Sequence, residues 1–418
     1  MKSNKLMLLF PIFFVLYEFT VYLANDMIMP GMLEVVKYFS ASNTFVPVSL
    51  TAFLLGGASL QIILGPLSDR FGRRKVLLFG ATYFLFATVF ILISNSMEQF
   101  LYARFLQGMG LCFIGTVGYA SIQELYEERK AIKIISLMAM ISLIAPLAGP
   151  LLGGLYIQFF HWRGIFIIIG ILALIALIGL FMYMPETVHL KLNSKNKPEK
   201  NADLSLLPKF NFLGCINNYI LILKNTKFLL GAFAISLSAG PLIAWIAISP
   251  VILMEKAKLS SVYYGICQIP IFGALIFGNI ILQKIIKKVQ LNRIIYFGSF
   301  FIIFGLILCG ILPIIFGESY FNIVIPFTIY CFGIALSNST LTRLTLYSSP
   351  IAKGSVSAIL SLISTLVYAL STYAMAFVYK NQSNVDFGLF CLFTGVIFTP
   401  VVVLFLIKED RKGFVYEN

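Results

Sequence analysis

Residues 9–30 read LFPIFFVLYEFTVYLANDMIMP, an apolar stretch broken by only two charges, Glu18 and Asp26. A membrane-spanning helix needs about 20 predominantly apolar residues, so this stretch is predicted to cross a bilayer. An ionised carboxylate near the middle of a membrane costs roughly 2.5–3.5 kcal/mol on insertion scales. The two acids are therefore expected to face a protein interior or a water-filled cavity rather than lipid.

The rest of the chain has the same apolar character. Of its 418 residues, 59% are hydrophobic and 11% are charged, whereas soluble domains carry about 25% charged residues. Lipid is thus expected to surround most of the protein. The net charge of +14 does not indicate a nucleic-acid partner, because the basic residues lie in short loops between apolar runs and build no basic module. With two His and six scattered Cys, no metal site is expected.

Apolar runs bounded by charges or turn residues predict twelve transmembrane helices. They cover approximately residues 6–29, 44–67, 76–95, 99–122, 132–156, 163–184, 227–252, 262–283, 294–315, 321–347, 355–379 and 387–407. The long polar stretch between the sixth and seventh runs divides them equally. We therefore predict an all-α integral membrane protein with an N-terminal six-helix bundle (1–184), a cytoplasmic linker (185–226) with room for a short interfacial helix, and a C-terminal six-helix bundle (227–418). Weak similarity between the halves agrees with a repeated transporter plan.

The distribution of Lys and Arg predicts the orientation. If both termini are cytoplasmic, 24 of the 31 Lys and Arg residues lie in cytoplasmic segments and 5 lie on the opposite face. Positive charge concentrates on the cytoplasmic side of membrane proteins. Both termini are therefore expected in the cytoplasm, and the first apolar run is too long for a cleaved signal peptide.

The charges inside the spans are the strongest functional signal. Glu18 and Asp26 are eight residues apart, hence about 12 Å along a helix axis and about 80° around it, so both can face one cavity. Arg104, in the fourth span, is expected to pair with Asp26. Two structural alternatives stay open: the acids make only interhelical hydrogen bonds or face an incidental aqueous vestibule, and Arg104 forms an ion pair that fixes helix register.

Three further segments have a functional and a structural interpretation. The loop GPLSDRFGRRK (65–75) has Gly65 for close packing and an acid, Asp69, that can accept a hydrogen bond from Arg70 or a helix N-terminus. The fifth span contains the prolines and glycines Pro146, Gly149, Pro150 and Gly153. Proline bends a helix and glycine allows close helix contact, so a kinked, closely packed helix is predicted. Such a helix suits a gate, and it equally suits ordinary membrane helix packing. Arg343, near the cytoplasmic end of the tenth span, is expected to snorkel, with a functional role left open.

These motifs resemble the major facilitator superfamily. GPLSDRFGRR (65–74) is similar to its loop between the second and third spans, RFLQG (104–108) to its fourth-span motif, and SLIAPLAGPLLGG (142–154) to the fifth-span motif of its drug/proton antiporters. Longer segments, among them LYEFTVYLANDMIMPGM, PLIAWIAISP and LTRLTL, resemble the MdfA type of multidrug exporter over nearly the whole chain.

The resemblance implies a two-bundle major facilitator fold, alternating access, a bacterial inner membrane location and a monomer. It also implies roles by matching position. Glu18 and Asp26 would be shared between proton and substrate, with Arg104 as their regulator. Tyr22, Asn25 and Leu50 match positions near the drug cavity. Asp69 and Arg70 match a charge pair that holds the cytoplasmic side closed.

We therefore expect a proton-coupled antiporter that exports lipophilic drugs, cationic and neutral. No Walker-type GxxxxGK[ST] is present, so the proton gradient rather than a cofactor would supply the energy. The alternative is a dedicated exporter of an endogenous metabolite such as a siderophore, which uses the same machinery. An uptake symporter fits the fifth-span motif less well. An enzyme or a channel would need a polar site or pore-lining rings that the sequence does not show.

Overall fold

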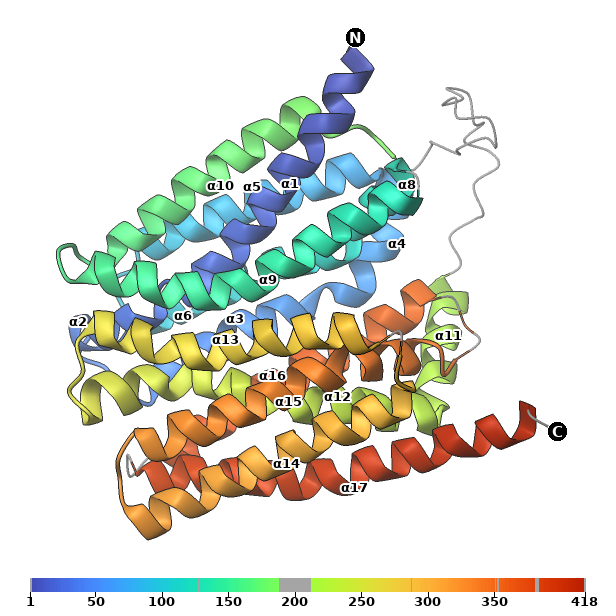
Figure 1. Cartoon of the computed structure of the whole chain (residues 1–418). Coiled ribbons are helices and arrows are strands. Elements are labelled where there is room, and N and C mark those ends of the chain that lie inside the picture. The colour runs from blue at the N-terminus through green and yellow to red at the C-terminus, as the bar shows by residue number, and fades with distance from the viewer. Residues whose placement is uncertain are drawn as a thin grey trace. The chain divides into compact units, whose positions relative to one another are not determined.

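The structure, a computed structural model, describes residues 2–126, 128–187, 212–286, 288–349, 351, 353–379 and 383–416. Helices dominate this part of the chain (Figure 1). They are α1 (Lys2–Asp26), α2 (Met32–Tyr38), α3 (Phe45–Ser59), α4 (Gln61–Phe71), α5 (Arg73–Leu92), α6 (Met97–Gly108), α7 (Gly110–Phe113), α8 (Tyr119–Leu125), α9 (Glu128–Ile157), α10 (Arg163–Tyr183), α11 (Phe212–Lys224), α12 (Thr226–Pro250), α13 (Ser261–Ile285), α14 (Leu291–Phe316), α15 (Phe321–Leu346), α16 (Lys353–Val378) and α17 (Asn384–Tyr416). A 3-10 turn, η1 (Met29–Gly31), and two π turns, η2 (Ile114–Gly118) and η4 (Val251–Lys256), interrupt them.

The predicted all-α membrane architecture is confirmed. In the described residues, ten helical stretches are long and apolar enough to cross a membrane, and the bent pair of α3 and α4 is an eleventh. The 30-residue helix α9 lies at the fifth predicted span, and the apolar part found in it, Ile144–Ile157, is shorter than the other spans. The main difference is at the C-terminal end, where α17 continues to Tyr416, beyond the predicted end at 407. The short helix α11 lies inside the predicted linker, for which a short helix had been allowed.

The chain forms two compact units. Unit 1 comprises Met1–Ile28, Ala52–Gly149 and Phe160–Leu213, and unit 2 comprises Met29–Thr51, Pro150–Phe159 and Gly214–Asn418. In unit 1, α1 packs along α10, and α10 along α5. In unit 2, α15 packs between α13 and α14, and α12 packs against α16 and α17. The predicted bundles, 1–184 and 227–418, divide the sequence differently and stay a prediction.

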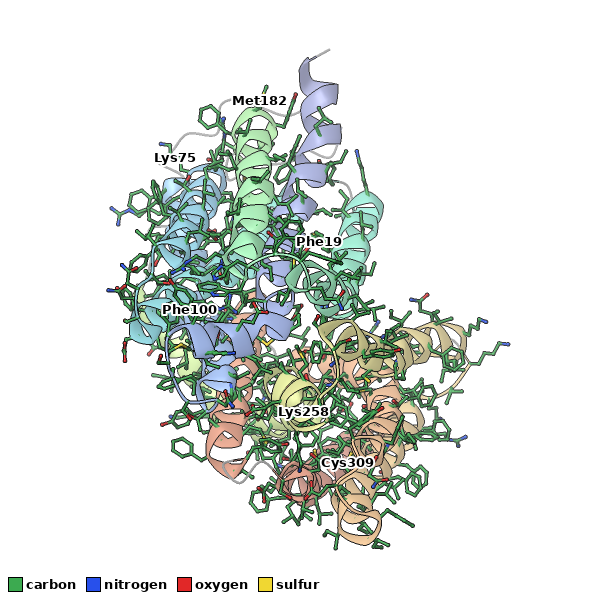
Figure 2. All side chains as sticks on the ribbon, turned by 90° about the vertical axis from the view of Figure 1, so that its left-hand side faces the viewer. Phe19, Lys75, Phe100, Met182, Lys258 and Cys309 are labelled. Atoms are coloured by element: carbon green, nitrogen blue, oxygen red, sulfur yellow. The ribbon has the colours of Figure 1, made fainter. Side chains whose placement is uncertain are left out.

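Large apolar side chains cover the outward-facing surfaces of the helices. Met182, which lies near the end of α10 (Figure 2), is 59% exposed, and Phe86 of α5 is 70% exposed. In water such a surface would drive aggregation, whereas lipid solvates it. Thr88 of α5, by contrast, is fully buried.

The second span is bent by 43° where α3 meets α4. Side chains on both sides of the break bind backbone carbonyls of the preceding turn: Ser59 Oγ donates to Gly56 O at 2.6 Å, and Gln61 Nε2 donates to Gly57 O at 2.8 Å. Such local side-chain bonds compete with the helical ladder and bend helices. Because the carbonyls keep donors, the bend leaves neither of them unsatisfied in lipid.

A tyrosine hydroxyl is inserted into the backbone of α12. Pro241 has no N–H to contribute to the helical ladder. The next hydrogen bond of the ladder, between Leu242 N–H and Ser238 O, is replaced by two bonds to the Tyr330 hydroxyl. The hydroxyl donates to Ser238 O at 2.5 Å and accepts from Leu242 N–H at 3.2 Å. These two groups are four residues apart and would otherwise bond to each other. Tyr330, on α15, is fully buried, so it holds an opened turn of α12 in the interior of unit 2.

We predict that Tyr330→Phe lowers the free energy of unfolding by about 1–3 kcal/mol, because two buried backbone groups lose their partner. Thermal unfolding of the purified protein in detergent measures this, with Tyr263→Phe, whose side chain is 62% exposed, as the matched control. Equal unfolding midpoints for both variants would contradict the prediction and indicate that the α12 ladder closes by itself.

Candidate functional site

The two acids of α1 are both buried in unit 1. Glu18 is fully buried and Asp26 is 4% exposed. One oxygen of Glu18 accepts a hydrogen bond from the Tyr119 hydroxyl at 3.1 Å, and the other, Oε2, has no partner. Tyr119 was not identified from the sequence, because an aromatic residue in an apolar span carries no local signal of such a contact. The burial of both acids agrees with the expectation that they face a protein interior.

Arg104 is also fully buried, and its guanidinium is held by neutral acceptors. It donates to Ala24 O at 3.1 Å, to Asn25 Oδ1 at 2.9 Å and to Gln107 Oε1 at 2.6 Å. Its charge also lies 4.6 Å from the centre of the Phe53 ring, a distance suited to a cation–π contact. These contacts tie α1, α3 and α6 together around one cation.

The expected direct pair between Arg104 and Asp26 is wrong for this structure. Among the described side chains, Arg104 forms no ion pair within 4.0 Å. The Asn25 amide lies between the two charges: its oxygen accepts from Arg104, and its nitrogen donates to Asp26 Oδ1 at 3.1 Å. An amide can accept and donate at once, so Asn25 connects the cation to the acid.

Helix α9 approaches α1 at Asp26. A Cβ atom added at Gly149 would lie 2.6 Å from Asp26 Cβ, closer than real Cβ atoms pack, so this position requires glycine. The predicted close packing of the fifth span is confirmed at this point. Pro146 and Pro150 both lie inside α9, which is one continuous helix, and Gly153 is buried in it. The gating role of these residues stays a prediction.

The remaining predicted site residues are spread over both units. Tyr22 is half-buried on α1 in unit 1, whereas Leu50 is buried on α3 within unit 2. Their role in a drug cavity stays a prediction. Arg343 is exposed near the end of α15, 5.9 Å from the centre of the Tyr347 ring. This exposure agrees with the snorkelling interpretation.

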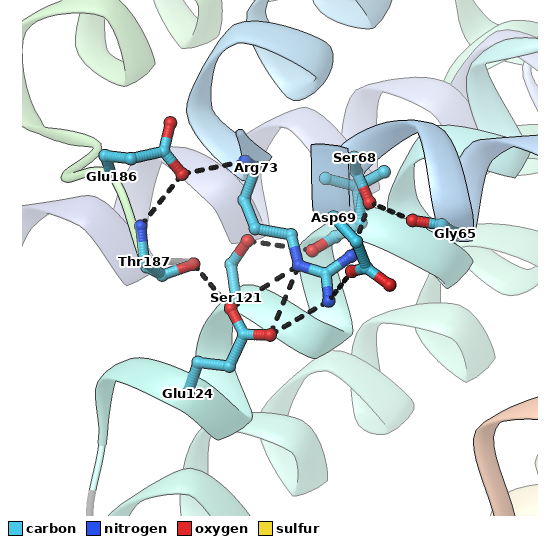
Figure 3. A network of polar contacts seen from close by, with 9 residues as sticks. Gly65, Ser68, Asp69, Arg73, Ser121, Glu124, Glu186 and Thr187 are labelled. Atoms are coloured by element: carbon cyan, nitrogen blue, oxygen red, sulfur yellow. Dashed lines mark hydrogen bonds and ion pairs between the residues drawn. The ribbon is translucent and has the colours of Figure 1, made fainter. Parts of the chain in front are cut away.

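The loop between α4 and α5 builds a second polar cluster, which we call the Arg73 cluster (Figure 3). Its members are Ser68, Asp69, Arg73, Glu124 and Glu186. Arg73 is 8% exposed. Its side chain lies 2.5 Å from Asp69 Oδ1, donates to Glu124 Oε1 at 2.9 Å, and donates to the Ser68 hydroxyl. One guanidinium thus joins α4, α5 and α8.

Arg73, not Arg70, is the partner of Asp69, which corrects the predicted Asp69–Arg70 pair. Asp69 and Arg73 lie on different helices, α4 and α5, and the non-helical turn at Gly72 (φ +97°) between these helices brings their side chains together. Arg73 is buried, so little water can replace its partners. Arg70 is exposed and lies 5.5 Å from the centre of the Phe71 ring. Gly65, predicted to allow close packing, has only the Thr116 methyl group near an added Cβ, at 3.4 Å, which is about the distance of an ordinary van der Waals contact.

Glu186 completes the cluster from the end of α10. Its Oε1 accepts from the backbone N–H groups of Arg73, at 2.8 Å, and Thr187, at 3.0 Å. A carboxylate at the first residues of a helix satisfies free N–H groups and the helix dipole. Gly72, just before α5, has φ +97°, and an added Cβ would lie 2.3 Å from Glu186 Oε2. The positive φ favours glycine there, whereas the contact would only require the end of the Glu186 side chain to shift.

The comparisons with known proteins agree with this architecture. The sequence model of the Major Facilitator Superfamily matches residues 14–372. A protein named "Multidrug transporter MdfA" from Edwardsiella piscicida is 44% identical over 412 residues, covering 99% of this chain and 97% of the relative. One of the same name from Escherichia coli O157:H7 is 43% identical over 417 residues, covering 100% and 98%.

Solved structures share the fold at low sequence identity. An inward-facing, occupied bacterial homologue of the human lysosomal transporter Spinster aligns with a TM-score of 0.71 and 15% identity, covering 96% of each chain. The D-xylose–proton symporter aligns with a TM-score of 0.70 and 16% identity, covering 93% of this chain and 97% of that one. The helices, the apolar exterior and the buried charges define a multi-pass membrane transporter. The chain belongs to the major facilitator superfamily.

We predict that Arg73→Lys lowers the free energy of unfolding by about 1–3 kcal/mol, since one ammonium cannot reproduce the fork that reaches three partners. Arg70→Lys, at an exposed position, is expected to change it by less than about 0.5 kcal/mol. Thermal unfolding in detergent compares the two variants. A larger loss in Arg70→Lys would restore the original assignment of the pair.

Proposed function

We propose that the chain is a proton-coupled antiporter that exports lipophilic drugs, cationic and neutral, from the cytoplasm by alternating access. The observation that carries the proposal is the burial of Glu18 and Asp26 on one helix, next to a buried Arg104. Multidrug relatives at 43–44% identity over nearly the full length support the substrate class. The location would be the bacterial inner membrane, with both termini cytoplasmic.

The chemistry follows from what a buried carboxyl group tolerates. In a membrane interior an unpaired carboxylate is costly, and it becomes acceptable when it takes up a proton or contacts a cation. A proton and a lipophilic cation would thus compete for the same acid. Neutral drugs would compete by displacing the polar contacts of Asp26. Outward movement of drug would then be coupled to inward movement of protons, with the proton gradient as the energy source.

Asn25 is suited to make Asp26 responsive to substrate. Among the described residues, Asn25 is the only one that is hydrogen-bonded to both Arg104 and Asp26. A ligand that displaces the amide would change the electrostatic surroundings of Asp26 without moving Arg104, because Ala24 O and Gln107 hold the guanidinium independently.

We expect addition of a lipophilic cation to the purified protein in weakly buffered detergent solution to release protons, and Asp26→Asn to lose this release. Glu34→Gln, which removes an exposed acid of α2, is the matched control and should release protons as the wild type does. Undiminished release in both Asp26→Asn and Glu18→Gln would contradict the proposed coupling. No release from the wild type across a broad panel would favour a dedicated metabolite exporter.

A further inference from the structure

One short helix, α8, connects the intramembrane acid Glu18 to the Arg73 cluster. Near its start, Tyr119 donates to Glu18 at 3.1 Å. Near its end, Glu124 accepts from Arg73 Nη2 at 2.9 Å and Nε at 3.3 Å. The two residues are five positions apart, hence about 7.5 Å along the axis. A movement of this helix that breaks one contact therefore strains the other.

The backbone on both sides of α8 departs from the regular α-helix. Before it, the π turn η2 (Ile114–Gly118) separates α8 from α7 and from α6, the helix that carries Arg104. Turns of this kind lie between regular helical segments and are frequent at functional sites. Gly115, inside the turn, has no heavy atom within 4 Å of an added Cβ. After α8, Tyr126 is extended, with φ −113° and ψ 148°. The seven-residue helix is thus bounded by non-α backbone at both ends.

The strength of the Tyr119 contact depends on the charge of Glu18. A hydrogen bond to a carboxylate is roughly twice as strong as one between neutral groups, so protonation of Glu18 weakens the hold on α8. The titratable groups around Glu18 are Tyr119 on α8 and Tyr22 on α1, which itself interacts with Tyr119. At the other end, Arg73 and Asp69 face Glu124, and Thr187 Oγ1 donates to its Oε2 at 2.7 Å.

We propose that α8 transmits the charge state of Glu18 to the Arg73 cluster, with Tyr119 as the positioning residue. An ionised Glu18 holds Tyr119 and keeps Glu124 against Arg73. A protonated Glu18 loosens α8 and weakens the Glu124–Arg73 contact. This inference rests on the proposed proton coupling, since it assumes that Glu18 changes its charge during transport. It adds the route by which that change reaches the cytoplasmic loop.

Amide hydrogen exchange of the full-length protein in detergent, without any drug, tests the route. We expect Glu18→Gln and Tyr119→Phe each to accelerate exchange of the peptides covering 65–76 and 119–126 by about tenfold, because each weakens the same charge-assisted bond. The double variant should exchange no faster than the faster single one. Glu124→Gln removes the charge that holds Arg73 directly, so it gives the exchange rate of peptide 65–76 when the Glu124–Arg73 contact is weakened. Tyr83→Phe, whose hydroxyl contacts Met109 Sδ at 3.1 Å, is the matched control and should leave both peptides unchanged.

Two outcomes would overturn the inference. The first is that peptide 65–76 exchanges at the wild-type rate in Glu18→Gln and in Tyr119→Phe, although it exchanges faster in Glu124→Gln. The second is multiplication of the two single effects in the double variant, which indicates independent damage. Neither outcome affects drug-induced proton release at Asp26, so failure of this route is distinguishable from failure of antiport.

Discussion

A charged guanidinium inside an apolar bundle needs hydrogen-bond acceptors, and Arg104 organises the interior of unit 1 through the acceptors of its two terminal nitrogens, Nη1 and Nη2. Its Nε has no partner among the described residues. Its acceptors come from α1 and from its own helix, and Phe53 of α3 covers its face. Gln107 passes the chain of hydrogen bonds on to Thr88 of α5 at 2.9 Å. Removing any one acceptor would leave a buried donor unpaired, at a cost of about 1–3 kcal/mol or more for a charged group. The position of Asp26 beside this cation is therefore a consequence of packing that extends over four helices.

The same rule explains the irregular helices. In a bilayer, every backbone N–H and C=O that leaves the helical ladder needs another partner. The break between α3 and α4 has the side chains of Ser59 and Gln61, and the opened turn of α12 has the hydroxyl of Tyr330. At these two places a side chain satisfies the backbone groups that the irregular helix leaves free. These places are also the ones at which a helix can change direction at low cost.

The sequence predicts some of these features well and others poorly, for physical reasons. Glu18, Asp26 and Arg104 are recognisable because a charge inside an apolar run is a local signal whose cost is known. Which of Arg70, Arg73 and Arg74 pairs with Asp69 cannot be read from the local sequence. All three look alike in a basic loop, and only the fold buries Arg73 against Glu124 and Glu186. The position of the Asn25 amide between Arg104 and Asp26 could not be predicted for a similar reason, because it depends on where side chains lie to within about an ångström. Twelve spans, by contrast, follow from hydropathy alone.

Glu186 and Thr187 have one more consequence, which concerns how the chain can be divided. Both lie after the last span of the first half, at positions that a hydropathy plot assigns to the linker, yet they bind Arg73 N–H and Glu124 within unit 1. Separate expression of the two halves, or insertion of a fusion partner between them, must therefore keep these two residues on the first fragment. A cut before Glu186 would separate the first fragment from Glu186, which caps the start of α5. For protein engineering, a junction between the halves therefore has to lie after Thr187.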